Sequence, residues 1–297
     1  MDREIKNGIG KVYIERGVDP YKTTRRILKK IRPQVKSGKV LIKPNLTTNA
    51  SSSEGITTDI NVCRAILENL RGCEIVIGDC GSDMKRSLEV NGYYKLGREF
   101  GIEIKDLNDD EIVMKGVPNP ISRFKKIPIA KTALDSDYII DVAKLKIHAL
   151  AQVTLTMKNM FGVIPKRRNR VRIHPYINEA IVDILQIVYP NFCIIDGIVG
   201  NEKDEVFSNP VMSEIIIAGK DAIATDSVGI RCMNLKPESV RHYVIAERVL
   251  GKRDVVVKGA RIEEVKKTYK TNVPISTRIR YLGEKSLSYL YPRFEFK

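Results

Sequence analysis

The chain has 297 residues, and its 51 lysines and arginines outnumber 36 aspartates and glutamates to give a formal net charge of +15. Hydrophobic residues make up 43% of the sequence, which is enough for a sizeable core. The charged start of the chain contains no signal-peptide core, and no apolar run reaches the roughly 18–20 residues of a membrane-spanning helix. These features argue against a membrane span, and they predict a cytoplasmic location.

The positive charge predicts an acidic partner, because such an excess attracts polyanions and small anionic ligands. The alternative is the charge-rich surface of a thermophilic protein, in which lysine, arginine and glutamate are all raised. The cysteines form no CxxC pair and no zinc-ribbon or ferredoxin pattern, so we expect buried free thiols and no iron–sulfur cluster. They are Cys63, Cys73, Cys80, Cys193 and Cys232.

Strand-like apolar runs alternate with helical stretches along the chain, which is typical of an α/β fold with a mostly parallel sheet and flanking helices. The expected strands are Lys11–Glu15, Lys39–Ile42, Cys73–Ile77, Ile102–Leu107, Asp137–Val142, Phe192–Ile195, Glu214–Ala218 and Asp254–Lys258. The expected helices are Tyr21–Gln34, Thr58–Leu70, Leu88–Phe100, Ile177–Val188, Asp221–Cys232 and Pro237–Leu250. In such sheets ligands bind beyond the carboxyl ends of the strands.

We interpret residues 1–297 as a single α/β unit that could divide into two subdomains around a cleft. The stretch Lys115–Pro128 has the composition of a loop or hairpin and could mark the subdomain boundary. Residues 251–297 form a basic carboxyl-terminal extension. Within it, Ser276–Tyr291 has the spacing of an amphipathic helix, which most often packs on its own core.

Polar residues follow several of the expected strands. Lys43 and Asn45 come directly after a buried run, and the loop Thr47–Ser53 adds hydroxyl groups. Asp79 follows the next strand and lies in a turn beside Gly78. This turn is not the GxGxxG fingerprint of a dinucleotide site. Two further aspartates are candidates: Asp196 follows the expected strand Phe192–Ile195, and Asp226 lies within the expected helix Asp221–Cys232.

The most informative run extends from the strand Ile139–Val142 to His148. If the strand continues, Lys144, Lys146 and His148 share one face, because strand side chains alternate with a period of two. Like charges this close repel each other, so the arrangement predicts an anion that joins them and lysines of lowered pKa. The alternative is a solvent-facing strand edge protected by lysines.

A second cationic segment follows directly. Thr154 and Lys158 are four residues apart, which places them on one face of an expected helix with Asn159 beside them. The run Lys166–Arg172 holds five cations and is expected to form a loop, either solvated or closing over an anion. His174 follows it.

Taken together, these segments resemble the family known as domain of unknown function number 362, over roughly Val40–Val228. The matching pieces are Lys43–Asn45, Gly78–Asp79, Ser136–Ile140, Lys144–His148, Val153–Thr154, Lys158–Gly162, His174, Ile195–Gly197 and Ala224–Asp226. The resemblance implies an α/β fold with these polar residues around one cleft, in an architecture similar to that of lactate racemases. Some relatives are labelled iron–sulfur proteins, but this chain lacks their cysteine set. It also lacks the family's glycine- and proline-rich loop, because Asn201–Pro210 replaces it.

The leading hypothesis is an enzyme that acts on a small carboxylate or phosphate. The expected catalytic residues are His148, His174 and Lys144, because histidine moves protons near neutral pH. Substrate binding is assigned to Lys43, Asn45, Lys146, Thr154, Lys158 and Asn159. Asp79, Asp196 and Asp226 could orient a histidine or hold a divalent metal ion.

Two other classes of function stay open. The net charge and the Lys166–Arg172 run favour an RNA-binding protein, although no recognised RNA-binding motif is present and aromatics are 6% of the residues. The altered loop Asn201–Pro210 favours an interaction protein that kept the fold and lost catalysis. The sequence leaves the substrate, the reaction, the metal and the oligomeric state open.

Overall fold

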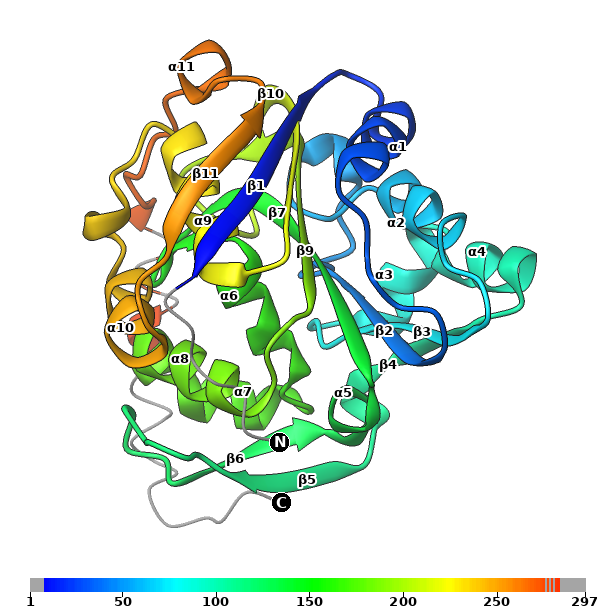
Figure 1. Cartoon of the computed structure of the whole chain (residues 1–297). Coiled ribbons are helices and arrows are strands. Elements are labelled where there is room, and N and C mark those ends of the chain that lie inside the picture. The colour runs from blue at the N-terminus through cyan, green and yellow to red at the C-terminus, as the bar shows by residue number, and fades with distance from the viewer. Residues whose placement is uncertain (1–7, 276, 278, 280, 284–297) are drawn as a thin grey trace.

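The computed structural model describes residues 8–275, 277, 279 and 281–283 (Figure 1). Within this part of the chain, a nine-stranded sheet has the order β11-β1-β10-β9-β7-β2-β3-β4, with β8 paired to β7. Its strands are β1 (Ile9–Arg16), β2 (Gly38–Pro44), β3 (Cys73–Asp79), β4 (Glu103–Asp106), β7 (Tyr138–His148), β8 (Gln152–Thr154), β9 (Phe192–Asn201), β10 (Pro210–Gly219) and β11 (Asp254–Gly259).

The half of the sheet that contains β9, β7, β2, β3 and β4 is parallel, and β10 runs antiparallel to both of its neighbours. A separate antiparallel hairpin consists of β5 (Ile112–Gly116) and β6 (Lys126–Ala130). Figure 1 shows this hairpin at one end of the molecule, beside the helices drawn in green. The α/β class and the mostly parallel sheet predicted from the sequence are therefore confirmed.

Helices cover both faces of the sheet (Figure 1). The first layer holds α1 (Pro20–Lys30), α2 (Ile60–Leu67), α3 (Met84–Val90) and α4 (Tyr93–Phe100). The second holds α6 (Thr156–Asn159), α8 (Ile177–Ile187), α9 (Ala222–Cys232) and α10 (Arg241–Leu250). The remaining short helices are α5 (Lys131–Asp135), α7 (Arg167–Ile173) and α11 (Ile262–Val265).

Strand β7 divides the interior, because its residues alternate between the two hydrophobic clusters. Ala143 and Leu145 pack with α8, α9 and α10, whereas Ile140 and Val142 pack with α1, α2 and α3. From Ile139 to His148 every residue of β7 is buried, as expected for a central strand that is covered on both faces.

All eight expected strands are present. The expected helix Leu88–Phe100 is two helices instead, because Gly92 has a φ of 78° and ends the helical path between α3 and α4. The stretch Lys115–Pro128 contains the end of β5, the loop of the β5–β6 hairpin and the start of β6. Asp183 of α8 holds this loop, because it accepts hydrogen bonds from the backbone of Ile121 and Ser122 at 2.8 and 2.9 Å. Most of the expected helix 276–291 lies outside the described residues.

Across the described ranges, no helix is long and apolar enough to cross a membrane.

Candidate functional site

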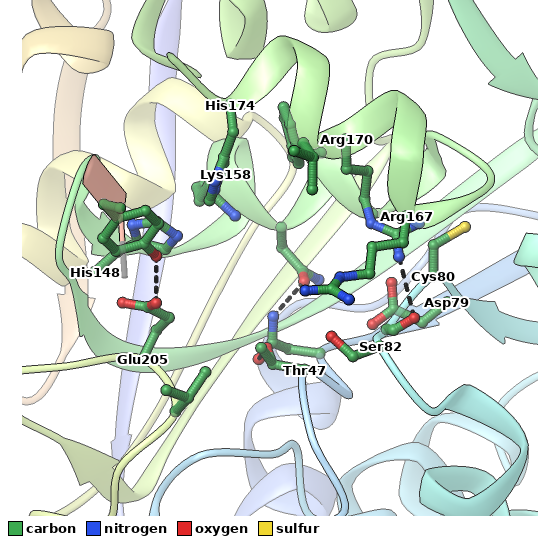
Figure 2. A pocket seen from close by; sticks show the side chains of 18 residues that line it. Thr47, Asp79, Cys80, Ser82, His148, Lys158, Arg167, Arg170, His174 and Glu205 are labelled. Carbon is green, nitrogen blue, oxygen red and sulfur yellow. Dashed lines mark hydrogen bonds between the residues drawn. The ribbon is translucent and has the colours of Figure 1, made fainter. Parts of the chain in front are cut away.

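A pocket of about 230 Å³ lies at the edge of the sheet where β2, β3, β7 and β9 end. This is the position at which parallel sheets usually bind ligands. Figure 2 shows the pocket and the side chains that point toward it. Its lining residues are Asn45, Thr47, Asp79, Cys80, Gly81, Ser82, His148, Lys158, Asn159, Phe161, Gly162, Arg167, Arg170, Val171, His174, Glu205, Val206 and Tyr281.

A buried polar network forms the floor of the pocket. The Lys43 ammonium lies 2.7 Å from a carboxylate oxygen of Asp79 and 3.2 Å from the amide oxygen of Asn159. Asn45 donates to the same Asn159 oxygen at 2.8 Å. The second Asp79 oxygen accepts the backbone N–H of Leu46 at 2.8 Å. Four residues that the sequence predicted for the site therefore meet in one network that ties β2 to β3 and α6.

Asp141 extends this network into the core. Its Oδ1 accepts a hydrogen bond of 2.7 Å from Asn159, while Oδ2 is buried and has no partner among the described residues. Burial raises the pKa of Asp141 well above its ordinary value. We therefore interpret Asp141 as a neutral carboxylic acid that fixes the orientation of the Asn159 amide.

Gly162 gives the turn after α6 room to lie against this network. A Cβ atom at this position would be 2.3 Å from the Asp79 carboxylate and 2.7 Å from the Lys43 ammonium. Real Cβ atoms do not approach so closely, so any larger residue must displace the buried ion pair.

The Gly162→Ala variant should lose about 1–3 kcal/mol of unfolding free energy, because the added methyl overpacks a buried charged pair. Urea unfolding followed by circular dichroism measures the loss. Gly116→Ala is the matched control, since a Cβ there meets nothing within 4 Å. Equal stability of the two variants would contradict the packing described here.

Lys158 enters the pocket from α6, whose backbone is fixed by Asp226. The Asp226 carboxylate accepts the N–H groups of Thr156 and Met157 at 2.8 and 3.0 Å. The Lys158 ammonium lies 5.0 Å from the centre of the Phe161 ring, and burial lowers its pKa to about 8. Asp226 is itself buried and does not line the pocket, so it acts through the helix.

The prediction that Thr154 and Lys158 share one face of a helix is wrong. Thr154 ends strand β8, and α6 begins two residues later at Thr156. Its hydroxyl is buried and has no hydrogen-bond partner in the described part of the chain. A β strand therefore precedes Lys158, and the four-residue spacing does not bring the two side chains together on a helix.

Two histidines, His148 and His174, form another part of the pocket wall. The rings of His148 and His174 are 5.9 Å apart in an edge-to-face arrangement. The Nδ1 atom of His148 accepts the backbone N–H groups of Leu150 and Ala151 at 3.1 and 3.2 Å. This nitrogen is therefore unprotonated, and Nε2 carries the proton. Burial lowers the pKa of His148 well below its ordinary value, so the ring stays neutral.

Glu205 and Tyr281 close the histidine end. Tyr281 donates a hydrogen bond to one oxygen of Glu205, and the backbone of Ala149 donates to the other at 3.0 Å. The Tyr281 ring centre is 5.3 Å from that of His174 and 6.3 Å from that of His148. A residue of the carboxyl-terminal region therefore helps to build the pocket.

The loop that follows β9 folds on its own side chains. Asn201 donates to the carbonyls of Asp204 and Phe207 at 2.6 and 2.9 Å, and Asp204 accepts the N–H of Val206 at 2.7 Å. These contacts give the loop a defined path that places Glu205 in the pocket wall.

The basic run Lys166–Arg172 is mostly a helix, not the loop expected from its composition. Helix α7 begins at Arg167, and Arg170 donates to the carbonyls of Ile164 and Gly81 and to Asn108 at 2.9, 3.1 and 2.8 Å. Figure 2 shows Arg167 and Arg170 on one side of the pocket and Lys158 and His174 on the other. Arg167 is exposed, whereas Arg170 is half-buried.

Two of the expected site lysines lie beneath the pocket instead of lining it. Lys144 pairs with Asp196 at 2.8 Å, and both side chains are buried. Lys146 donates to Thr47 and to the carbonyl oxygen of Ile56 at 3.0 and 2.8 Å. Burial lowers the pKa of Lys146 to about 7. Both lysines hold neighbouring segments in place, and neither lines the pocket.

The three aspartates assigned to a metal ion are engaged separately, Asp79 by Lys43, Asp196 by Lys144 and Asp226 by α6. Among the described residues, no three side chains of histidine, cysteine, aspartate or glutamate are grouped as metal ligands.

Several residues in and below the pocket were not singled out from the sequence. Asp141 carried a signal, because a carboxylate inside an apolar strand must be neutral or paired. Glu205 and Tyr281 gave no such signal, since their placement depends on the fold of a loop and of a distant segment. Arg167 was included in the basic run, but its position at the start of a helix was not predicted.

These features define an α/β protein with a pocket, lined by cationic and anionic side chains, at the carboxyl edge of its parallel strands. The model of a domain of unknown function, DUF362, matches residues 40–231, which is more than half of the chain. The chain therefore belongs to this family, as its motifs predicted.

Two individual proteins are similar to the chain. The thylakoid-associated protein sll1697 of Synechocystis sp. is 26% identical over 233 residues, which cover 72% of this chain and 69% of that protein. The lactate racemase apoprotein from Thermoanaerobacterium thermosaccharolyticum aligns with a TM-score of 0.43 and 12% identity. That alignment covers 71% of this chain and 55% of the racemase, so the chain spans about half of the racemase length.

Proposed function

We propose that this protein is an enzyme that binds a small organic anion, a carboxylate or phosphate, in the pocket and transfers a proton to or from it. The observation that carries the proposal is the set of charges around the pocket. Lys158 and Arg167 form no ion pair with a carboxylate among the described residues. Of the two carboxylates that line the pocket, Asp79 is paired with Lys43, and Glu205 accepts hydrogen bonds from Tyr281 and Ala149. An anion that enters the pocket would provide the missing negative charge.

The histidines supply the proton chemistry in this proposal. His148 stays neutral and presents its Nε2 proton as a hydrogen-bond donor, because Nδ1 is occupied by two backbone N–H groups. His174 is half-buried and lies beside it, where it can exchange protons with a bound molecule. The role of His148 as a donor follows from its tautomer, which the two backbone N–H groups fix.

The size of the pocket favours a small ligand over a polymer. A volume of about 230 Å³ accommodates a metabolite, and its cationic residues converge on one recess. A nucleic acid would instead require a row of phosphate contacts across an open surface. We therefore propose that the arginines of helix α7 bind a small anionic substrate and not a nucleic acid.

The Arg167→Gln variant should bind oxalate at least about tenfold more weakly than the parent, because a charge-assisted contact to an anion contributes about 1.5–3 kcal/mol. Isothermal titration at low salt measures both affinities. The adjacent Arg168→Gln variant is the control, since Arg168 is exposed and does not line the pocket. Equal weakening in both variants, or equal binding of the neutral analogue oxamide by the parent protein, would contradict the proposal.

A further inference from the structure

We propose that the Lys158 amine forms an imine with the carbonyl carbon of a 2-oxo carboxylate whose carboxylate faces Arg167 and Arg170. This inference rests on the proposed anion site and narrows its substrate class. It assigns Lys158 a covalent role in addition to its charge.

The first support is the difference between Lys158 and the other lysines of the site. Lys43 and Lys144 each pair with a buried aspartate at 2.7 and 2.8 Å. Lys146 donates to three oxygen atoms at 2.8 to 3.2 Å. In the described part of the chain, no oxygen atom accepts a hydrogen bond from Lys158, which lines the pocket. Lys158 is therefore the lysine of this group whose amine is available to a ligand.

The second support is the environment of the Lys158 nitrogen, which disfavours the ammonium form. The Phe161 ring, 5.0 Å away, favours the ammonium form through a cation–π contact, so it is burial that lowers the pKa of Lys158. Burial, followed by the charges of Lys43 and Arg170, lowers the pKa of Lys158, while Glu205 and Asp79 oppose the shift. A lysine with a pKa of about 8 has a neutral, nucleophilic fraction at physiological pH.

The third support is the distribution of groups across the pocket. Figure 2 shows Lys158 and His174 on one side and Arg167 and Arg170 on the other. A molecule with a carbonyl next to a carboxylate can place its carboxylate at the arginines and its carbonyl at Lys158. The pocket of about 230 Å³ suits a molecule of this size.

The chemical step is balanced without a redox partner. The neutral Lys158 nitrogen attacks the carbonyl carbon to form a carbon–nitrogen bond. The carbonyl oxygen then leaves as water with the two hydrogens of the amine, and a carbon–nitrogen double bond remains. His174, the half-buried histidine on the same side of the pocket, takes a proton from the amine nitrogen and delivers it to the departing oxygen.

Trapping with glyoxylate and sodium cyanoborohydride tests the inference, because the reductant converts an imine to a stable secondary amine. The full-length protein is treated briefly at pH 8, and peptide mass spectrometry compares Lys158 with the exposed Lys166. At this pH the neutral fraction of a lysine with a pKa of about 8 exceeds that of an ordinary lysine on the order of 100-fold. We expect at least about tenfold faster labelling of Lys158, and protection of it by oxalate.

The outcomes separate this inference from the proposed function. If oxalate binds in an Arg167-dependent manner but glyoxylate labels Lys158 no faster than Lys166, the imine is excluded and the anion site stands. If oxalate neither binds nor protects, the anion site fails and the imine loses its basis. Rapid labelling of Lys158 that oxalate does not slow would also contradict the inference, since the carboxylate would then play no part.

Discussion

Replacing Lys43 with methionine should lower the free energy of unfolding by about 3–5 kcal/mol, the usual cost of removing one partner from a buried ion pair. Lys43 is fully buried, and its loss leaves the Asp79 carboxylate, 4% exposed, without its counter-charge. Asn159 would also lose the hydrogen bond of 3.2 Å that Lys43 donates. The substitution should therefore weaken the whole network that forms the floor of the pocket, not only the ion pair.

Guanidinium unfolding of the parent and the Lys43→Met variant measures this loss. The matched control is Lys85→Met, which removes an ion pair of similar length, 2.8 Å, whose side chains are 72% and 64% exposed. Such an exposed pair contributes little to stability, because water and salt screen its charges. Adding Asp79→Leu to Lys43→Met should restore part of the stability, because no unpaired charge then stays buried. Equal losses in the Lys43 and Lys85 variants would contradict the buried network.

Ionisation of the buried Asp226 carboxyl group should lower the free energy of unfolding as the pH rises from about 4 to 8. Burial raises the pKa of Asp226 in the folded protein to about 7, from an ordinary value of 3.8. Between these values the folded state binds more protons than the unfolded state, so stability falls with increasing pH. The contribution is complete below pH 3.8 and is lost as the pH passes through about 7.

A rise of the Asp226 pKa from 3.8 to about 7 corresponds to at most about 4 kcal/mol of unfolding free energy. Other groups titrate in the same range, so the useful quantity is the difference in unfolding free energy between the parent and Asp226→Asn. Because asparagine does not titrate, the parent should lose stability relative to this variant as the pH rises from 4 to 8. A difference that is constant across this range would show that Asp226 is not held in the environment described here.

The sequence was most informative where backbone geometry alone fixes the outcome. The period of two in β7 placed Lys144, Lys146 and His148 on one face, opposite Ala143 and Leu145. The polar residues at the ends of β2 and β3 meet because parallel strands end at the same edge of the sheet. This rule brings Lys43, Asn45 and Asp79 together, and Asn159 of α6 joins them in one network.

Other features depend on contacts between distant segments, which a single sequence does not specify. Lys144 lies beneath the pocket because the register of β7 and β9 places Asp196 directly opposite it. The start of α6 at Thr156 depends on Asp226, which lies 70 residues away and caps its backbone. Glu205 enters the pocket through a loop that folds on Asn201 and Asp204.

The location of a bound anion tests the central claim most directly. The full-length protein crystallised with selenate, a phosphate-like dianion, allows anomalous scattering to locate the selenium atom without reference to any assumed site. We predict a peak inside the pocket, with a selenate oxygen about 2.7–3.2 Å from the Lys158 ammonium or the Arg167 guanidinium. Selenate bound on the outer surface while the pocket holds none would contradict the account.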